Sequence, residues 1–369
     1  MTTYRILLLP GDGVGPEVIA EARATLDLVA DAGGYQIKFT EGLIGGAAID
    51  AYGTSLRDEE IEAARDADAV MLGAVGGPKW EGVAPEIRPE AGLLRLRSAL
   101  GLFANLRPIR VFDALVDSSP MKAEVVRGVD MLIVRELTGG IYFGKPSEQR
   151  VTPEGREAID TLIYHEAEIV RLVELGYALA AGRRRKVTSV DKANVMASSR
   201  LWREITNEIA ARHPEIETEH ALVDSTAMKL ISRPGDFDVL VMENMFGDIL
   251  SDEAAVLAGS LGMLPSASLN GRKPDRAGSE AVQFGMYEPI HGSAPDIAGN
   301  GIANPSGAML SAAMLLRTSF GRDGDAQAIE AAVDAALNAG ARTADIGSGA
   351  DSLSTRAFGD AVRDQLKRA

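Results

Sequence analysis

Strand-like and helix-like segments alternate from the first residues of this chain. Apolar runs predict strands at residues 5–9, 36–40 and 69–73, and amphipathic stretches predict helices at 16–32 and 56–65. Such alternation is typical of an α/β fold, in which helices connect the parallel strands of a sheet. A chain of 369 residues with 46% hydrophobic content can form two lobes, so we expect two lobes sharing a central mixed sheet flanked by helices.

The middle of the chain differs from both ends, and this difference predicts the boundaries of the lobes. Separate strands are expected at 103–107, 131–135, 187–191 and 239–242, and a long helix at 161–181. The C-terminal part returns to helices, expected at 306–318, 326–337 and 355–367. We therefore predict one lobe made of residues 1–102 and 259–369 and a second lobe made of residues 103–258.

Charge and composition exclude several classes of partner. The net charge of −15 is dispersed along the chain, unlike the basic surface of a protein that binds nucleic acid. No cysteine is present, so disulfides and thiolate chemistry are excluded, and a cytoplasmic location suits this composition. No apolar stretch is long enough to span a membrane, and the first residues predict a strand rather than a signal peptide.

Two carboxylates, Asp248 and Asp252, stand four residues apart after an apolar run at 238–242. On a helix this spacing places both on one face. Taken alone, such a pair is usually a solvated helical face. Its position at the carboxyl end of a predicted strand favours a ligand site instead. Because oxygen ligands prefer a hard cation such as Mg²⁺ or Mn²⁺, a metal site is the first hypothesis.

The first loop, Gly11-x-Gly13-x-Gly15, has only part of a dinucleotide-binding fingerprint. Its third glycine has the wrong spacing and Pro16 follows it, so we do not expect a Rossmann fold. A tight loop beside a ligand and a plain turn remain equally consistent with this sequence. A second segment rich in glycine and proline, at 76–92, has the composition of an active-site loop.

Three arginines, Arg97, Arg107 and Arg135, occur where strands and loops are expected to converge. A guanidinium fork binds a carboxylate through two hydrogen bonds, so three such groups suit a dicarboxylate substrate. Each arginine could individually form a surface ion pair. Arg135 is the strongest candidate because it ends an apolar run.

Lys192 follows the predicted strand at 187–191. Beside a metal and other cations, its ammonium group would lose affinity for its proton, as a general base requires. Tyr142 is the complementary candidate for an acid. Taken alone, both residue types are more often structural or solvated.

A long loop with three glycines and three prolines is expected at 287–305. Loops of this length are usually functional or disordered, and its apolar and hydrogen-bonding residues favour a surface that binds a ligand. His291 alone would most often be a hydrogen-bonded loop residue. The other three histidines show no metal-binding spacing.

Together these segments resemble the decarboxylating β-hydroxyacid dehydrogenases, the isocitrate/isopropylmalate dehydrogenase family. The resemblance covers nearly the whole chain and is closest to the members that act on 3-isopropylmalate. The motifs that carry it lie at residues 9–17, 72–80, 103–108, 135–144, 190–194, 246–252 and 291–299.

The resemblance implies an isopropylmalate dehydrogenase-like fold and a two-part reaction. The C2 alcohol would be oxidised by transfer of a hydride from C2 to NAD while its hydroxyl gives a proton to a base, after which CO₂ leaves and an enolate is protonated. A Mg²⁺ or Mn²⁺ ion held by Asp224, Asp248 and Asp252 would stabilise the developing charge. Lys192 would be the base and Tyr142 would deliver the later proton. Lys192 and Asp224 would enter the site of a neighbouring subunit, so a homodimer with shared active sites is expected.

The resemblance also assigns roles to the two lobes. Residues 1–102 and 259–369 would bind the cofactor, and residues 103–258 would bind substrate, metal and the second subunit. Asp296 favours NAD, because a carboxylate accepts from the 2′-hydroxyl of NAD and repels the 2′-phosphate of NADP. The expected cofactor contacts are Val14, Gly76, Glu90, Asn194, Glu288, His291, Gly292, Ser293, Ala294, Asp296 and Asn304.

Substrate choice is expected to depend on the helix that follows Glu90. Leu93 and Leu94, together with Val195, would pack an isopropyl group, and such methyl contacts contribute about 1–3 kcal/mol to discrimination. Either leucine could instead belong to the core. The resemblance places Arg97, Arg107, Arg135 and Asp224 against the polar part of the substrate.

Two alternatives remain open. A sister dehydrogenase would act on homoisocitrate, tartrate or another 3-substituted malate, and Leu93 and Leu94 are the features against it. A catalytically silent regulatory subunit would lack at least one of the catalytic or metal-binding side chains. All five are present: Tyr142, Lys192, Asp224, Asp248 and Asp252.

Overall fold

The computed structural model describes residues 2–347 and 352–368 and divides the chain into two compact units. The first unit contains Met1–Leu102, Phe112–Pro120 and Ala258–Ala369, and the second contains Phe103–Val111 and Met121–Leu257. The predicted lobes differ from these units in the placement of residues 112–120 and of residue 258. Each unit is described by itself below.

In the first unit, a mixed set of strands carries the glycine-rich loops at its ends. In spatial order these strands are β2 (Gln36–Glu41), β1 (Thr3–Gly11), β3 (Ala69–Ala74), β12 (Gly285–Pro289) and β11 (Pro265–Leu269). The pairs are parallel except for β11 with β12, which is antiparallel. Every residue of β3 is buried, as expected for a parallel strand that is covered on both faces.

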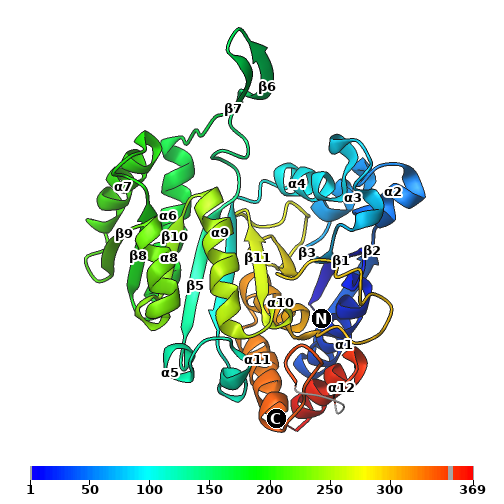
Figure 1. The fold of residues 1–369 in the computed structure, drawn as a ribbon. Helices are drawn as coiled ribbons and strands as arrows, with labels where there is room; N and C mark the ends of the chain where they lie inside the picture. The colour runs from blue at the N-terminus through cyan, green and yellow to red at the C-terminus, as the bar shows by residue number, and fades with distance from the viewer. Residues whose placement is uncertain (1, 348–351, 369) are drawn as a thin grey trace. The chain divides into compact units, whose positions relative to one another are not determined.

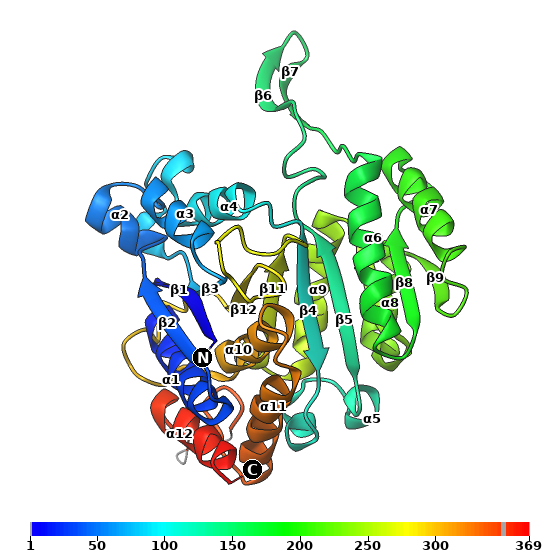
Figure 2. The same cartoon turned by 180° about the vertical axis from the view of Figure 1, so that it is seen from behind.

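Helices of the first unit pack around two apolar cores. They are α1 (Gly15–Gly33), α2 (Gly46–Tyr52), α3 (Asp58–Arg65), α4 (Pro89–Ala99), α10 (Ser306–Thr318), α11 (Asp323–Asn338) and α12 (Thr355–Leu366). One core joins α3 and α4 to β1 and β3, and the other joins α10, α11 and α12. Figures 1 and 2 show α1, α10, α11 and α12 packed side by side. Helix α10 is buried on nearly all sides, which explains why its sequence is mostly apolar.

The second unit has its own mixed set of strands. In spatial order they are β4 (Ala104–Arg110), β5 (Asp130–Glu136), β10 (Val239–Met242), β8 (Lys186–Asp191) and β9 (Glu217–Leu222). Only β4 with β5 is antiparallel. The carboxyl ends of β5, β10 and β8 therefore meet at one edge, where the loops that follow them can share a site.

Helices cover both faces of these strands. Figures 1 and 2 show α6 (Glu166–Ala181) and α7 (Ala197–Ala210) on one face, and α8 (Val223–Ser232) and α9 (Asn244–Ala255) on the other. The short helix α5 (Ala123–Val126) precedes β5. An antiparallel hairpin of β6 (Ser147–Thr152) and β7 (Gly155–Asp160) projects from this unit (Figure 1).

The α/β prediction is confirmed, and the predicted strands and helices appear near the expected positions. The predicted helix at 161–181 was wrong at its start, because α6 begins at Glu166. His165 is extended and its backbone N–H donates to Glu168 Oε2 at 2.8 Å, which fixes the helix start there. The predicted loop at 287–305 was also wrong at its start, since β12 continues to Pro289.

Among the described residues, no helix has both the length and the apolar composition needed to cross a membrane.

Phe358 tests the packing of the core that α10, α11 and α12 share. Its side chain is fully buried in that core. We expect Phe358→Ala to lower the free energy of unfolding by about 3–5 kcal/mol, because it removes a buried aromatic ring and leaves a cavity. Urea unfolding measures this change. As a control, Val282→Ala removes a half-exposed side chain and should cost less than about 1 kcal/mol; equal losses would contradict the packing described here.

Candidate functional site

In the second unit, Arg135 near the end of β5 is held by the first turns of α9. The arginine is 6% exposed and its register partner on β10 is Met242, which lies just before α9. Its Nε and Nη2 donate to Asn244 Oδ1 at 3.1 and 2.9 Å, and its Nη1 pairs with Asp248. Both prongs of the guanidinium fork are thus occupied by α9.

Arg107 on β4 binds the next turn of the same helix. Its Nη1 donates to Asp252 Oδ1 at 2.8 Å and to Ser251 Oγ at 2.7 Å. Its Nη2 lies 3.9 Å from Asp248 Oδ1. Asp248 and Asp252 are therefore on one face of α9, as their spacing predicted, and that face meets two arginines.

Tyr142 reaches the same carboxylate from the loop after β5. Its hydroxyl donates to Asp248 Oδ2 at 3.0 Å, although about half of the side chain is exposed. Partial burial, and then the negative charge of Asp248, raise the pKa of Tyr142 above its usual value of 10. At neutral pH the phenol therefore keeps its proton and can donate it.

A buried polar network fixes the start of α9. Glu243 accepts from the backbone N–H of Phe246 at 2.9 Å, and the Tyr164 hydroxyl accepts from that of Asn244 at 2.9 Å. Tyr164 also lies 3.3 Å from Glu243 Oε2, and burial raises the pKa of Glu243. The N–H groups at the start of α9 thus have hydrogen-bond partners. The positions of Asn244 and Asp248 on this helix are therefore fixed.

Lys192 and Asp224 form a separate pair in the second unit. Lys192 follows β8, and its Nζ lies 2.6 Å from Oδ1 of Asp224, which is in the first turn of α8. This cation lowers the pKa of the Asp224 carboxyl. The neighbouring Asn194 and Val195 are exposed, Val195 at 67%. Lys192 is held in place because its backbone N–H donates to Ser199 Oγ at 3.0 Å.

The predicted metal ligands are only partly brought together within one chain. Asp248 and Asp252 share a face of α9, whereas Asp224 is paired with Lys192. In residues 2–347 and 352–368, no three acidic or histidine side chains lie in an arrangement that could hold a metal ion. The donor set is nevertheless made of carboxylate oxygens alone, which fits Mg²⁺ or Mn²⁺ rather than a softer metal.

In the first unit, Arg97 on α4 pairs with Glu288 on β12. Both side chains are largely buried, at 16% and 9% exposed. Arg97 Nε and Glu288 Oε2 are buried and have no hydrogen-bond partner in the structure. Buried polar atoms of this kind are seldom left unsatisfied, so the pair is suited to a further polar ligand.

Two close backbone approaches bring other predicted cofactor residues together. The Val14 N–H donates to the Ser293 carbonyl at 2.8 Å, and a Cβ on Gly13 would lie 1.9 Å from that oxygen. A Cβ on Gly76 would lie 2.8 Å from Glu90 Oε1. Gly13 and Gly76 both have positive φ, so glycine is required at both positions.

His291 presents an unpaired nitrogen in the same unit. Its Nδ1 lies 2.9 Å from the Gly292 carbonyl, which can only accept, so Nδ1 carries the proton and Nε2 is a free acceptor. Nε2 is buried without a partner, and burial lowers the pKa of the imidazole. Ala294, two residues past Gly292, has a left-handed φ of 40°, which is rare for a residue with a Cβ.

Asp296 and Asn304 differ in their availability. Asp296 is exposed and its carboxylate can meet a ligand. Asn304 is 5% exposed, and its amide already donates to Asp345 and accepts from the Ser306 N–H, both at 3.0 Å. The hydrogen bonds of Asn304 therefore fix the shape of this segment, and its side chain is less available to a ligand than that of Asp296.

The two leucines predicted for substrate choice lie in different environments. Leu93 packs against the core of α3, α4, β1 and β3, whereas Leu94 is 47% exposed. Leu93 thus belongs in part to the core, as the alternative interpretation of these leucines allowed, whereas Leu94 is available for a ligand.

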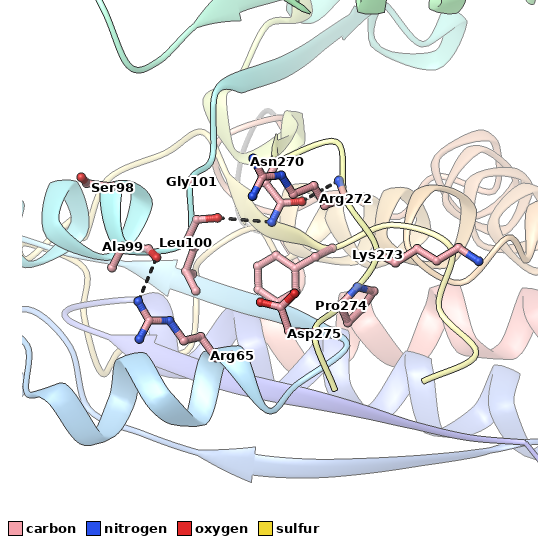
Figure 3. A pocket seen from close by; sticks show the side chains of 11 residues that line it. Arg65, Ser98, Ala99, Leu100, Gly101, Asn270, Arg272, Lys273, Pro274 and Asp275 are labelled. Carbon is pink, nitrogen blue, oxygen red and sulfur yellow. Dashed lines mark hydrogen bonds between the residues drawn. The ribbon is translucent and has the colours of Figure 1, made fainter. Parts of the chain in front are cut away.

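A cavity of about 300 Å³ lies elsewhere in the first unit, at the C-terminal end of α4 (Figure 3). Arg65 donates to the Ala99 carbonyl there, and Asn270 donates to the Leu100 carbonyl. None of the predicted site residues lines this cavity.

Sequence reasoning missed two residues that organise these sites, Asn244 and Asp12. Asn244 accepts from Nε and Nη2 of Arg135 and stands two residues before the motif at 246–252, but no spacing rule singles it out. Asp12 lies in the first glycine-rich loop, and its carboxylate accepts from three backbone N–H groups. A buried acid among glycines was the available signal for Asp12.

Comparison with known proteins gives full-length similarity to one family. Residues 5–362 match the family described as isocitrate/isopropylmalate dehydrogenase. A 3-isopropylmalate dehydrogenase of Anaeromyxobacter dehalogenans is 55% identical over 362 residues, covering 98% of this chain and 99% of that protein. A protein of the same name from Bacillus subtilis is 54% identical over 360 residues, covering 97% and 96%.

Solved structures are similar over the same length. The crystal structure of isocitrate dehydrogenase from Methylococcus capsulatus has a TM-score of 0.83 at 31% identity and covers 99% of both chains. A beta-decarboxylating dehydrogenase from Thermococcus kodakarensis, in its apo form, has a TM-score of 0.78 at 35% identity, covering 99% of this chain and 96% of that one.

His291 gives a pH-dependent test of the first unit. Because burial lowers its pKa below 6.5, the unfolded chain binds a proton at this residue at a higher pH than the folded chain does. Stability should therefore fall as pH drops below 6.5 through the folded-state pKa. NMR of the ring nitrogens between about pH 5 and pH 8 measures that pKa. The His291→Gln variant assigns the signal and should flatten the stability slope; a ring that titrates at or above 6.5 would contradict the burial.

Proposed function

The chain belongs to the isocitrate/isopropylmalate dehydrogenase family, and on that premise we propose that it oxidises and decarboxylates 3-isopropylmalate with NAD. The products are 4-methyl-2-oxopentanoate and CO₂, a step of leucine biosynthesis. The observation that carries the proposal is the full-length identity of 54–55% to proteins named 3-isopropylmalate dehydrogenase. The cytoplasmic location expected from the sequence is part of the same proposal.

Arginines hold the substrate carboxylates in this proposal. Arg107 and Arg135 are now paired with Asp252 and Asp248, so each is already fixed in place with one guanidinium nitrogen on a carboxylate. A dicarboxylate substrate can replace Asp252 and Asp248 as the partner of these arginines, so its binding needs no further cationic side chain. Arg97 is assigned the same role, and Leu93, Leu94 and Val195 are assigned to the isopropyl group.

The acidic residues hold the divalent cation. Asp248 and Asp252 present oxygens from one face of α9, and we assign the third carboxylate to Asp224 of the partner subunit. When bound, Mg²⁺ or Mn²⁺ acidifies the C2 hydroxyl and neutralises the charge that develops as CO₂ leaves. When the arginines engage the substrate, Asp248 and Asp252 lose their present partners and are free to act as ligands.

Two side chains move the protons. Lys192 accepts the proton of the C2 hydroxyl, and Asp224 beside it keeps the amine oriented. Tyr142 supplies the proton that ends the reaction, which agrees with its raised pKa and with its contact to Asp248. The two residues lie on different segments of the second unit, after β8 and after β5.

The first unit holds NAD in this proposal. The unpaired Glu288 oxygen and the His291 Nε2 are acceptors that a nucleotide can satisfy, and the exposed Asp296 repels a 2′-phosphate. The assigned contacts in the first unit are Val14, Gly76, Glu90, Glu288, His291, Gly292, Ser293, Ala294, Asp296 and Asn304, and Asn194 of the second unit is assigned to the cofactor as well.

A homodimer completes the active site. Helices α8 and α9 expose apolar side chains in the single chain, including Met228 at 66% and Ile249 at 60%. Asp224 is one turn before Met228 on α8, so both lie on the same face. A second copy that covers this apolar face would meet Asp224 as well.

Steady-state kinetics test the proposed reaction directly. We expect Mg²⁺- or Mn²⁺-dependent reduction of NAD with 3-isopropylmalate, at a kcat/KM roughly 10–200-fold above isocitrate, tartrate and malate. NADP should be a poor acceptor, and a chelator should abolish turnover. Equal turnover of isocitrate, or full activity in chelator, would contradict the assigned substrate or the metal requirement.

Shared active sites predict complementation between two inactive variants. Lys192→Ala and Asp248→Asn should each form inactive dimers of normal mass. A heterodimer purified through two different tags should regain about half of the wild-type activity, because one of its two sites then receives every intact residue. If each site is built from a single chain, every site in the heterodimer carries one defect and it stays inactive.

A further inference from the structure

Asp12 is a buried carboxylate that binds backbone rather than a cation. It is 4% exposed and lies in the loop after β1. Its Oδ1 accepts from the Ala47 N–H at 2.7 Å, and its Oδ2 accepts from the N–H groups of Gly46 and Gly76, both at 2.8 Å. No cationic side chain of residues 2–347 and 352–368 forms an ion pair with it, so its charge is balanced by these N–H dipoles.

Of the two segments that the Asp12 carboxylate binds, the start of α2 at Gly46 and Ala47 carries no assigned cofactor residue, whereas Gly76 is itself an assigned cofactor contact. Gly76 lies against Glu90, as the 2.8 Å approach of a built Cβ shows. Two residues after Asp12, the Val14 N–H donates to the Ser293 carbonyl at 2.8 Å. Asp12 thus links two contacts. Its carboxylate binds Gly76 of the Gly76–Glu90 contact, and its own loop continues to Val14 of the Val14–Ser293 contact.

The geometry around Asp12 leaves little room for these segments to move. The Asp12 N–H donates to the Ala74 carbonyl at 2.8 Å, so the loop is fixed to the end of β3. Gly45 has a φ of 73°, and a Cβ there would lie 2.4 Å from Asp12 Oδ2. Backbone approaches the carboxylate this closely only because glycine is present.

We propose that Asp12 is a positioning residue for the cofactor, setting the spacing between the segments of Val14, Gly76 and Glu90. The inference rests on the proposed function, because it assumes that these segments bind NAD. Asp12 itself is covered by the N–H groups that it binds, so it acts through its neighbours and is not a catalytic residue.

The Asp12→Asn variant separates this role from a general contribution to stability. An amide has one acceptor oxygen, so its NH₂ group would face at least one of the three N–H donors and break that contact. We expect the dissociation constant and KM for NAD to rise about tenfold or more, as for one lost charge-assisted hydrogen bond. The kcat at saturating NAD and the KM for 3-isopropylmalate should stay within about twofold.

Asp68→Asn is the matched control. Asp68 is also fully buried in the first unit and accepts from the Arg5 N–H at 2.7 Å and from the Arg276 guanidinium. Asp68 contacts no predicted cofactor residue, so the Asp68→Asn substitution should lower the melting temperature and leave the affinity for NAD unchanged. If Asp12→Asn behaves like this control, with a lower melting temperature and unchanged NAD affinity, the positioning role is wrong.

Calorimetric titration of NAD without substrate gives a readout that is independent of turnover. If the wild-type protein does not bind NAD at all, the proposed function fails and the role of Asp12 falls with it, whereas normal NAD binding by both the wild type and Asp12→Asn overturns the role of Asp12 alone. Should Asp12→Asn not fold, Gly45→Ala keeps the charge and displaces the carboxylate. That variant should weaken NAD binding several-fold, and wild-type affinity would overturn the proposal.

Discussion

The contact of Arg135 with α9 organises the second unit. A guanidinium that is 6% exposed is costly unless its donors are paired, and Asn244 and Asp248 satisfy them from two successive turns of α9. The helix must therefore lie close to β5, which Gly247 permits: a Cβ there would lie 2.5 Å from Arg135 Cγ. With α9 fixed, Tyr142 reaches Asp248 and Arg107 reaches Asp252. One buried cation thus determines where the acidic pair stands.

The same arrangement explains how a site rich in opposite charges is stable before any ligand binds. Asp248 and Asp252 of α9 are each neutralised by an arginine, and Asp224 is neutralised by Lys192. In the proposed function, a dianionic substrate and a divalent cation together add no net charge, so their binding would exchange partners instead of burying uncompensated charge. Since desolvated unpaired charges are the costly species, this exchange keeps the site balanced in both states.

The spacing of residues and their position after a strand predicted the acidic pair of α9 from the sequence. Contacts between residues far apart in the chain could not be predicted in this way. Asp248 and Asp252 follow an apolar strand at helical spacing, so their shared face could be derived. The acceptor role of Asn244 depends on how α9 packs on β5, and no local pattern encodes that distance. Helix α2 was missed because it is short and is bounded by Gly45 and Gly53, and Asp12 from another segment satisfies its first N–H groups. The β6–β7 hairpin was missed because its strands are largely exposed and lack an apolar face.

Substrate choice cannot be deduced from the fold, because a TM-score of 0.83 to an isocitrate dehydrogenase accompanies only 31% identity. The proposed preference for an isopropyl group depends on two leucines of α4. Leu93 contributes partly to the core, so its replacement by a polar residue would also cost packing energy. Leu94 is exposed, so in the proposed function it is the position where the side chain can be selected for the ligand alone. One apolar contact of this size discriminates by a few kcal/mol at most, and the charged end of the substrate must therefore supply most of the binding energy.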